Sequence, residues 1–166
     1  MMTSRRTFIK AGLLGGLVLG AGGVWYAASR EQAPAGRLTR SARSMFQAIT
    51  PVMLAGMLGE GSGRIERVVD GVERAVAGLS AAAQSELADL FGLLGFYPVR
   101  KLLTGIGDWR LATPADIEAS LSGWRFHHYA LLQGAYAAMH DLVLGAWYAQ
   151  PESWEAIAYP GPPEVR

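Results

Sequence analysis

Apolar residues recur at intervals of three and four along most of this chain, and no apolar run of strand length alternates with the period of a β-strand. Between residues 64 and 79, for example, one helical face is apolar and the opposite face carries the charges. The spacing predicts helices over 38–58, 64–79, 81–94, 98–106 and 114–149. We therefore expect an all-α fold, a small bundle of about five to six helices with an N-terminal signal helix and an extended, proline-rich C-terminal tail.

Residues that favour helix ends mark several boundaries of the expected bundle. Ser80 is expected to cap a helix, and Thr113 with Asp116 comes close to a capping box. Pro51 is expected to kink or restart the first helix, since proline removes a backbone donor. The last long helix is expected to be broken near Gly123.

Residues 1–35 have the organisation of an export signal. A cationic segment, residues 4–10, precedes the uncharged apolar stretch 11–28, which at about 18 residues is at the lower limit for crossing a bilayer. The cationic segment resembles the twin-arginine (Tat) motif, with Ile9 in place of leucine. The residues that carry this resemblance are Ser4, Arg5, Arg6, Phe8, Ile9 and Lys10.

The resemblance implies recognition by the Tat translocon, which exports folded proteins, and a location in the periplasm. Residues 33–35 read Ala-Pro-Ala, a small-x-small pattern typical of a cleavage site. If the signal is retained instead, residues 11–28 would contact the membrane and anchor the protein in the inner membrane. Both alternatives stay open at this point.

The composition excludes several function classes. The chain has no cysteine, so it has no disulfide, no Cys-ligated zinc, no iron–sulfur cluster and no haem attached through C-x-x-C-H. Its formal net charge of +1 is too small for a protein that binds nucleic acid through electrostatics, and we expect no nucleic-acid partner.

Three histidines are the candidates for chemistry. On a helix His127 and His128 would point about 100° apart, and His128 and His140 would lie ~18 Å apart along the axis, so a shared metal ion is not expected. A helix would also separate His140 from Asp141. We expect no catalytic residue, no metal and no cofactor in this chain, with an enzyme that uses His128 or His140 with Asp141 as the weakest alternative.

Aromatic residues are concentrated in the last third of the chain. One set follows helical spacing and is expected to be core: Tyr129, Leu132, Tyr136, Met139, Val143 and Trp147. The aromatic content exceeds what one helix face can bury, and Trp and Tyr are typical of protein interfaces. The residues expected to contact a partner are Trp124, Trp147, Tyr148, Trp154, Tyr159 and Pro160.

Residues 146–163, AWYAQPESWEAIAYPGPP, together with the Tat-like leader and the helical middle, resemble a known group of subunits. These are the Tat-exported small (gamma) subunits of membrane-associated, FAD-dependent dehydrogenases of the glucose–methanol–choline type, namely gluconate 2-dehydrogenase subunit 3 and the sorbitol dehydrogenase small subunit. The resemblance implies that FAD belongs to the larger partner subunit and that a c-type cytochrome, where present, takes the electrons. It implies no catalytic residue here, and the missing cysteine leaves no covalent tie to a partner.

The expected organisation is a signal over 1–35, a helical domain over 36–150 and an extended Trp/Tyr/Pro tail over 151–166. The expected function is that of a non-catalytic accessory subunit that co-exports and stabilises a periplasmic FAD-dependent dehydrogenase. The alternative is a membrane-anchored periplasmic assembly or structural factor that acts without a flavoprotein partner.

Overall fold

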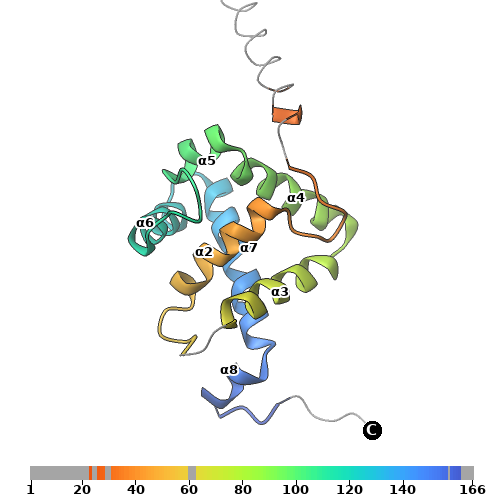
Figure 1. The fold of residues 1–166 in the computed structure, drawn as a ribbon, viewed down its shortest axis with the longest axis vertical. Coiled ribbons are helices and arrows are strands. Elements are labelled where there is room, and N and C mark those ends of the chain that lie inside the picture. The colour runs from red at the N-terminus through yellow and green to blue at the C-terminus, as the bar shows by residue number, and fades with distance from the viewer. Residues whose placement is uncertain (1–22, 24–25, 29–30, 60–62, 157, 162–166) are drawn as a thin grey trace, which may run out of the picture. The chain divides into compact units, whose positions relative to one another are not determined.

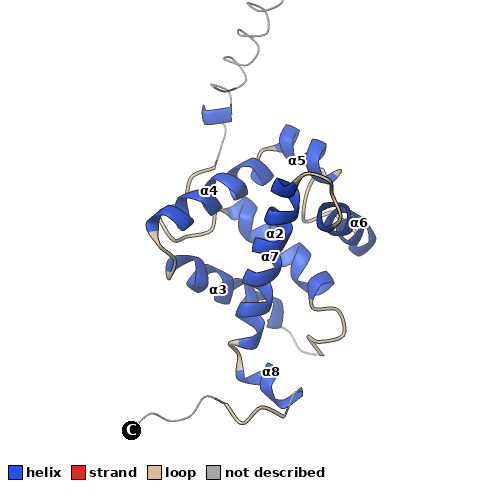
Figure 2. Ribbon diagram, turned by 180° about the vertical axis from the view of Figure 1, so that it is seen from behind, coloured by secondary structure: helices blue, strands red, loops and turns tan. Residues whose placement is uncertain are grey.

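The computed structural model describes residues 23, 26–28, 31–59, 63–156 and 158–161. The chain separates into two compact units, residues 1–30 and residues 31–166, and we call the second unit the helical body. Its described residues form helices and loops without a strand, which confirms the all-α fold (Figure 2). The helices are α2 (Arg40–Met53), α3 (Arg64–Ala77), α4 (Ala81–Gly95), α5 (Tyr97–Thr104), α6 (Pro114–Arg125), α7 (Ala130–Tyr148) and α8 (Pro151–Ala156).

Helix α2 lies at the centre of the body and contacts α3, α4, α6 and α7. Figure 1 shows α2 crossing α7, with α5 at one end of the body and α8 at the opposite end, and Figure 2 shows the same arrangement from behind. The apolar face of α2 is fully buried at Phe46 and Ile49, and Phe46 meets Phe91 of α4 edge to face at 5.3 Å between ring centroids. Helices α3 and α7 cross closely at Gly71, where a Cβ would lie 2.9 Å from Cβ of Ala146.

The expected helix starts are confirmed where a polar side chain satisfies the first backbone donors. Ser80 accepts a hydrogen bond from the N–H of Ala83. Thr113 and Asp116 form a complete capping box at the start of α6, because each side chain accepts from the backbone N–H of the other residue.

Two expected boundaries differ in the structure. Pro51 lies in the last turn of α2, which ends at Met53, so the first helix is shorter than the expected 38–58. The long C-terminal helical region is broken at residues 126–129, not near Gly123. Burial of Trp124 beside Gly123 keeps the last turn of α6 packed, and the N–H of Tyr129 is satisfied outside a helix by Nδ1 of His127 at 3.1 Å.

The apolar stripe expected on the last long helix is core in its C-terminal half, where Met139, Val143 and Trp147 are buried on α7. Tyr129 does not belong to it, since this residue is the N-cap of α7 and is exposed. None of the helices in the described ranges combines the length and apolar character needed to cross a bilayer. Most of the stretch 11–28 lies outside these ranges.

Candidate interaction site

Two of the six residues expected to contact a partner belong to the core instead. Trp124 is 4% exposed and Trp147 is 3% exposed. The indole Nε1 of Trp124 donates to the carbonyl oxygen of Leu103 at 2.9 Å, so the single donor of the ring is satisfied within the body. Their expected role as surface anchors is therefore corrected to a role in packing.

Residues 151–156, the first six of the expected extended tail, form α8 instead. The prediction of an extended segment is therefore wrong for these six residues. Proline is favoured at the first position of a helix because its missing N–H would be unsatisfied in any case and its φ already suits the helix. Pro151 takes that position. The hydroxyl of Ser153, which is buried, donates to the carbonyl oxygen of Gln150 at 2.7 Å and fixes the turn between α7 and α8.

The remaining expected residues come together around α8. We call Tyr148, Trp154 and Tyr159 the C-terminal aromatic cluster. Nε1 of Trp154 donates to the carbonyl oxygen of Tyr148 at 2.8 Å, and the rings of Trp154 and Tyr159 meet edge to face at 5.7 Å. The N–H of Tyr159 donates to the carbonyl oxygen of Trp154 at 2.9 Å, and the exposed Pro160 follows directly.

The chain returns over the cluster at Gly161, which has φ +96°. A Cβ at Gly161 would lie 3.1 Å from the Trp154 ring, so the backbone packs directly on the indole. Tyr148 and Tyr159 nevertheless keep 44% and 45% of their surface exposed. The cluster is thus ordered by its own chain and still presents aromatic surface to a partner.

Contacts with the rest of the body hold α8 in place. Glu152 of α8 lies 3.2 Å from the guanidinium of Arg67 on α3, measured from Oε1 to Nη2. The buried side chain of Gln150 donates to the carbonyl oxygen of Ala146 at 3.0 Å. The hydroxyl of Tyr148 points at the sulfur of Met57, 3.8 Å away, beyond the end of α2. A surface fixed in this way loses little conformational entropy when a partner binds.

The histidines lie differently from expectation. His127 and His128 are in the loop between α6 and α7, with their rings stacked at 4.4 Å between centroids. His140 and Asp141 are not held apart by the helix, since Nδ1 and Oδ1 lie 3.4 Å from each other. Across the ranges that the structure describes, no three His, Asp or Glu side chains are grouped so that they could hold a metal ion.

His140 also lines an open groove of about 290 Å³ between α2, α6 and α7. Its ring stacks on Tyr136 at 5.6 Å, and the guanidinium of Arg125 lies 6.0 Å from the Tyr136 centroid. Sequence reasoning missed this grouping, because Arg125 and His140 are on different helices and only the turn at 126–129 brings the two helices together.

The residues of the Tat-like motif, from Ser4 to Lys10, lie outside the described residues. Comparison with known proteins gave no matching family model, no matching curated protein and no matching solved structure.

Proposed function

We propose that this protein is a non-catalytic accessory subunit that carries a periplasmic FAD-dependent dehydrogenase through the Tat pathway and stabilises it there. The export role is supported by the Tat-like sequence at residues 4–10. The docking role is supported by the C-terminal aromatic cluster, which lies within the segment that resembles dehydrogenase small subunits. In this proposal FAD is bound by the larger partner, and electrons leave that partner directly or through a c-type cytochrome.

The observation that carries the docking role is the combination of exposure and order at Tyr148 and Tyr159. Aromatic side chains that are held rigidly and half exposed are typical of the residues that dominate protein interfaces, because they bury a large area at small entropic cost. The carbonyl oxygen of Tyr148 accepts from Nε1 of Trp154, the N–H of Tyr159 donates to the Trp154 carbonyl oxygen, and the Tyr159 ring meets the indole edge to face, so the arrangement exists before a partner binds.

The export role is tested by replacing Arg5 and Arg6 with lysine in the full-length chain. If the pair is exported together, both this protein and the flavoprotein should remain in the cytoplasm, and flavin-linked dehydrogenase activity should disappear from the periplasmic fraction. The matched control replaces Arg37 and Arg40 with lysine, which makes the same chemical change at two positions outside the motif. A flavoprotein that still reached the periplasm in the Arg5/Arg6 variant would contradict co-export.

Gentle purification of the native protein separates this proposal from the alternative of a membrane-anchored factor without a flavoprotein partner. A yellow polypeptide of larger mass should accompany the protein and should dissociate when the aromatic cluster is disrupted. Recovery of the protein alone from intact membranes, under conditions that preserve other complexes, would favour the alternative.

A further inference from the structure

A groove follows helices α2 and α6 on the surface of the body. Two hollows of about 290 and 330 Å³ lie along these helices, and Val52 of α2 lines both. The α6 residues that line the two hollows have helical spacing and form one face of that helix: Pro114, Ile117, Glu118, Leu121, Ser122 and Arg125. The lining residues of α2, from Ser44 to Val52, follow the same spacing. The two hollows are therefore parts of one groove, which we call the α2–α6 groove.

The groove has an apolar floor and the length of a short helix. Ile117 and Leu121 are buried beneath it, and Val52 is partly buried. Helix α6 advances about 16 Å along the groove, which is about three helical turns. The α2 side chains of Ser44 and Ala48 are small, so a third helix can approach at the usual distance of about 8–10 Å between axes. This geometry suits the apolar face of an amphipathic helix.

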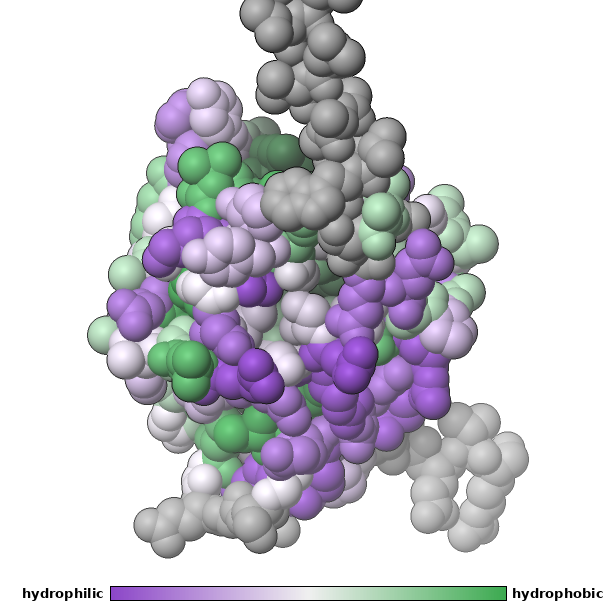
Figure 3. All heavy atoms as spheres, turned by 45° about the horizontal axis from the view of Figure 1, so that its top comes forward, coloured by the Kyte–Doolittle hydropathy of each residue, from purple (hydrophilic) through white to green (hydrophobic). Residues whose placement is uncertain are grey.

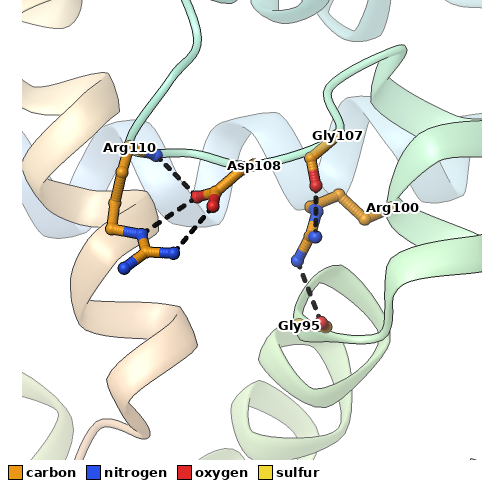
Figure 4. A network of polar contacts seen from close by, with 5 residues as sticks. All are labelled: Gly95, Arg100, Gly107, Asp108 and Arg110. Atoms are coloured by element: carbon orange, nitrogen blue, oxygen red, sulfur yellow. Dashed lines mark hydrogen bonds and ion pairs between the residues drawn. The ribbon is translucent and has the colours of Figure 1, made fainter.

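The loop that precedes α6 forms one wall of the groove. Trp109 and Arg110 of this loop line the groove beside the first turn of α6. Figure 4 shows Arg110 held by Asp108, whose carboxylate accepts from the guanidinium at 2.8 Å and from the backbone N–H at 3.0 Å. The wall is therefore formed before a partner binds, which lowers the entropy that binding costs.

Two charged side chains along the groove have no partner of opposite charge. In the part of the chain that the structure describes, neither Arg125 nor Glu118 forms an ion pair. The guanidinium of Arg125 instead lies 5.2 Å from the ring centroid of Phe126 and 6.0 Å from that of Tyr136. Glu118 is exposed seven residues earlier on α6, about 10 Å away along the axis. A partner can complement both charges with an acidic and a basic side chain two helical turns apart.

The groove leads towards the C-terminal aromatic cluster. Met53 lines the groove at the end of α2, and Met57 follows four residues later. The hydroxyl of Tyr148 points at the sulfur of Met57, 3.8 Å away. On α7, His140 lines the groove and Tyr148 lies eight residues further on, about 12 Å along the axis. A single partner can therefore contact the aromatic cluster and the groove together.

The exposed apolar side chains at the α5 end do not share one face. Tyr97 and Leu102 lie five residues apart on α5, which is about 140° around its axis. Figure 3, in which the top of the view in Figure 1 comes forward, shows separate apolar patches among polar side chains. A partner therefore meets a shaped apolar surface along α2 and α6 rather than at the α5 end.

We propose that the α2–α6 groove receives an amphipathic helix of the flavoprotein partner, about three turns long. The apolar stripe of this helix covers Val52, Ile117 and Leu121. An acidic side chain of the helix pairs with Arg125, and a basic side chain seven residues away pairs with Glu118. The inference rests on the proposed function, because the partner is the same flavoprotein, and it adds a second contact surface to the aromatic cluster.

The absence of cysteine allows a direct test in the full-length complex. Ser122→Cys places a thiol in the groove, and the matched control Ser85→Cys makes the same change at an exposed serine of α4 that does not line it. Each thiol is labelled with a benzophenone maleimide, and the complex with the flavoprotein is irradiated. The label at position 122 should cross-link to a flavoprotein segment with an acidic and a basic residue seven positions apart, whereas the label at position 85 should give no comparable product.

A charge variant tests the pairing at the end of the groove. Arg125→Gln should weaken flavoprotein binding about tenfold, and the loss should shrink as salt is added. Arg74→Gln removes the same charge from an exposed position on α3 and should leave the affinity unchanged. Urea unfolding of both variants, with midpoints close to that of the unaltered protein, shows that the fold is kept.

A flavoprotein that copurifies but is not cross-linked from position 122 would overturn the inference and leave the proposed function in place. Equal losses of affinity in Arg125→Gln and Arg74→Gln would also overturn it, since net charge and not the groove would then set the affinity. Cross-linking between two copies of this chain would identify a second copy as the occupant and overturn it as well. If no flavoprotein copurifies, the proposed function fails and this inference fails with it.

Discussion

The two ends of the helical body expose apolar residues in different ways. At the α8 end, the aromatic cluster is half exposed, and Trp154 is bonded to the backbone of its neighbours. At the α5 end, the exposed residues are mainly aliphatic, and Leu102 and Leu111 have more than four fifths of their surface in water. Both ends therefore expose apolar side chains, and both are held by hydrogen bonds, through Trp154 at the α8 end and through Arg100 and Arg110 at the α5 end.

The difference lies in what the hydrogen bonds hold. A protein interface gains from side chains whose position is set in advance, because ordering them on binding would cost free energy. At the α8 end the indole of Trp154 is itself hydrogen-bonded, whereas at the α5 end the hydrogen bonds of Arg100 hold the backbone near the exposed leucines.

The largest effect is expected when the ordered end is broken by Trp154→Ala. This change removes the ring on which Tyr159 and Gly161 pack and the donor to the carbonyl of Tyr148. Truncation of a buried tryptophan costs about 3–5 kcal/mol, and since Trp154 is partly exposed we expect about 2–3 kcal/mol less free energy of unfolding in urea. The copurifying flavoprotein should be lost as well.

A companion variant separates stability from docking. Tyr159→Ala removes a half-exposed ring and should change the unfolding free energy by no more than about 1 kcal/mol, yet lower the affinity for the flavoprotein at least tenfold. If Trp154→Ala and Tyr159→Ala both retained the partner at full affinity, the cluster would not be the docking surface.

The corresponding change at the other end is Arg100→Met, which keeps the length of the side chain and removes its hydrogen bonds to Gly95 and Gly107. Burial lowers the pKa of Arg100, and an arginine side chain stays protonated in proteins. Loss of the two hydrogen bonds should lower the free energy of unfolding by about 1.5–2 kcal/mol. The loss is no larger because methionine also removes the buried Nε, which finds no acceptor among the described residues.

Hydrogen exchange locates this effect. Amides of α5 and of the loop up to Thr113 should exchange faster in Arg100→Met, whereas those of α8 should not change. Flavoprotein binding should persist, and a variant that lost it would show that the two ends are coupled rather than independent. Arg100→Lys is the control, since it restores one donor and should recover part of the loss.

The sequence predicted the helices well because their starts depend on local chemistry. A capping hydroxyl at Ser80 or Thr113 acts on backbone donors two or three residues away, so the signal and its effect lie in the same short segment. The turn at 126–129 was misplaced because it depends on tertiary contacts, namely the burial of Trp124 and the bond from Tyr129 to His127. Propensity alone placed the break at the nearest glycine.

The candidate site was predicted only in part for a related reason. The composition indicated an interface in the last third of the chain, but aromatic residues are equally suited to cores, and no local signal separates Trp147 from Tyr148. These neighbours point about 100° apart on α7, and one is 3% and the other 44% exposed. The exposure of Tyr97 and Leu102 on α5 was not predicted, because the side chains of an eight-residue helix that face solvent are known only from the rest of the fold.

A smaller effect is expected from Glu152→Gln, which breaks the ion pair between α8 and α3. The side chains of Arg67 and Glu152 are both about half exposed, so the pair should contribute less than about 1 kcal/mol and should weaken as salt is added. Urea unfolding at low and at high salt measures this. Glu66→Gln removes the same charge from the neighbouring position on α3, and an equal response in this control would show that the pair itself adds nothing.

The smallest effect is expected when acid protonates Asp108 at the α5 end. Hydrogen bonds from the side chain and the backbone N–H of Arg110 lower the pKa of Asp108 from 3.8 to about 2. Because the folded-state pKa is the lower one, the stabilisation is present above pH 4 and is lost as the pH falls from about 4 through 2. Asp108→Asn should therefore flatten this part of the pH dependence of urea unfolding. A slope between pH 4 and pH 2 that is the same in the variant as in the unaltered protein would mean that the Asp108–Arg110 pair does not hold the loop that carries Leu111.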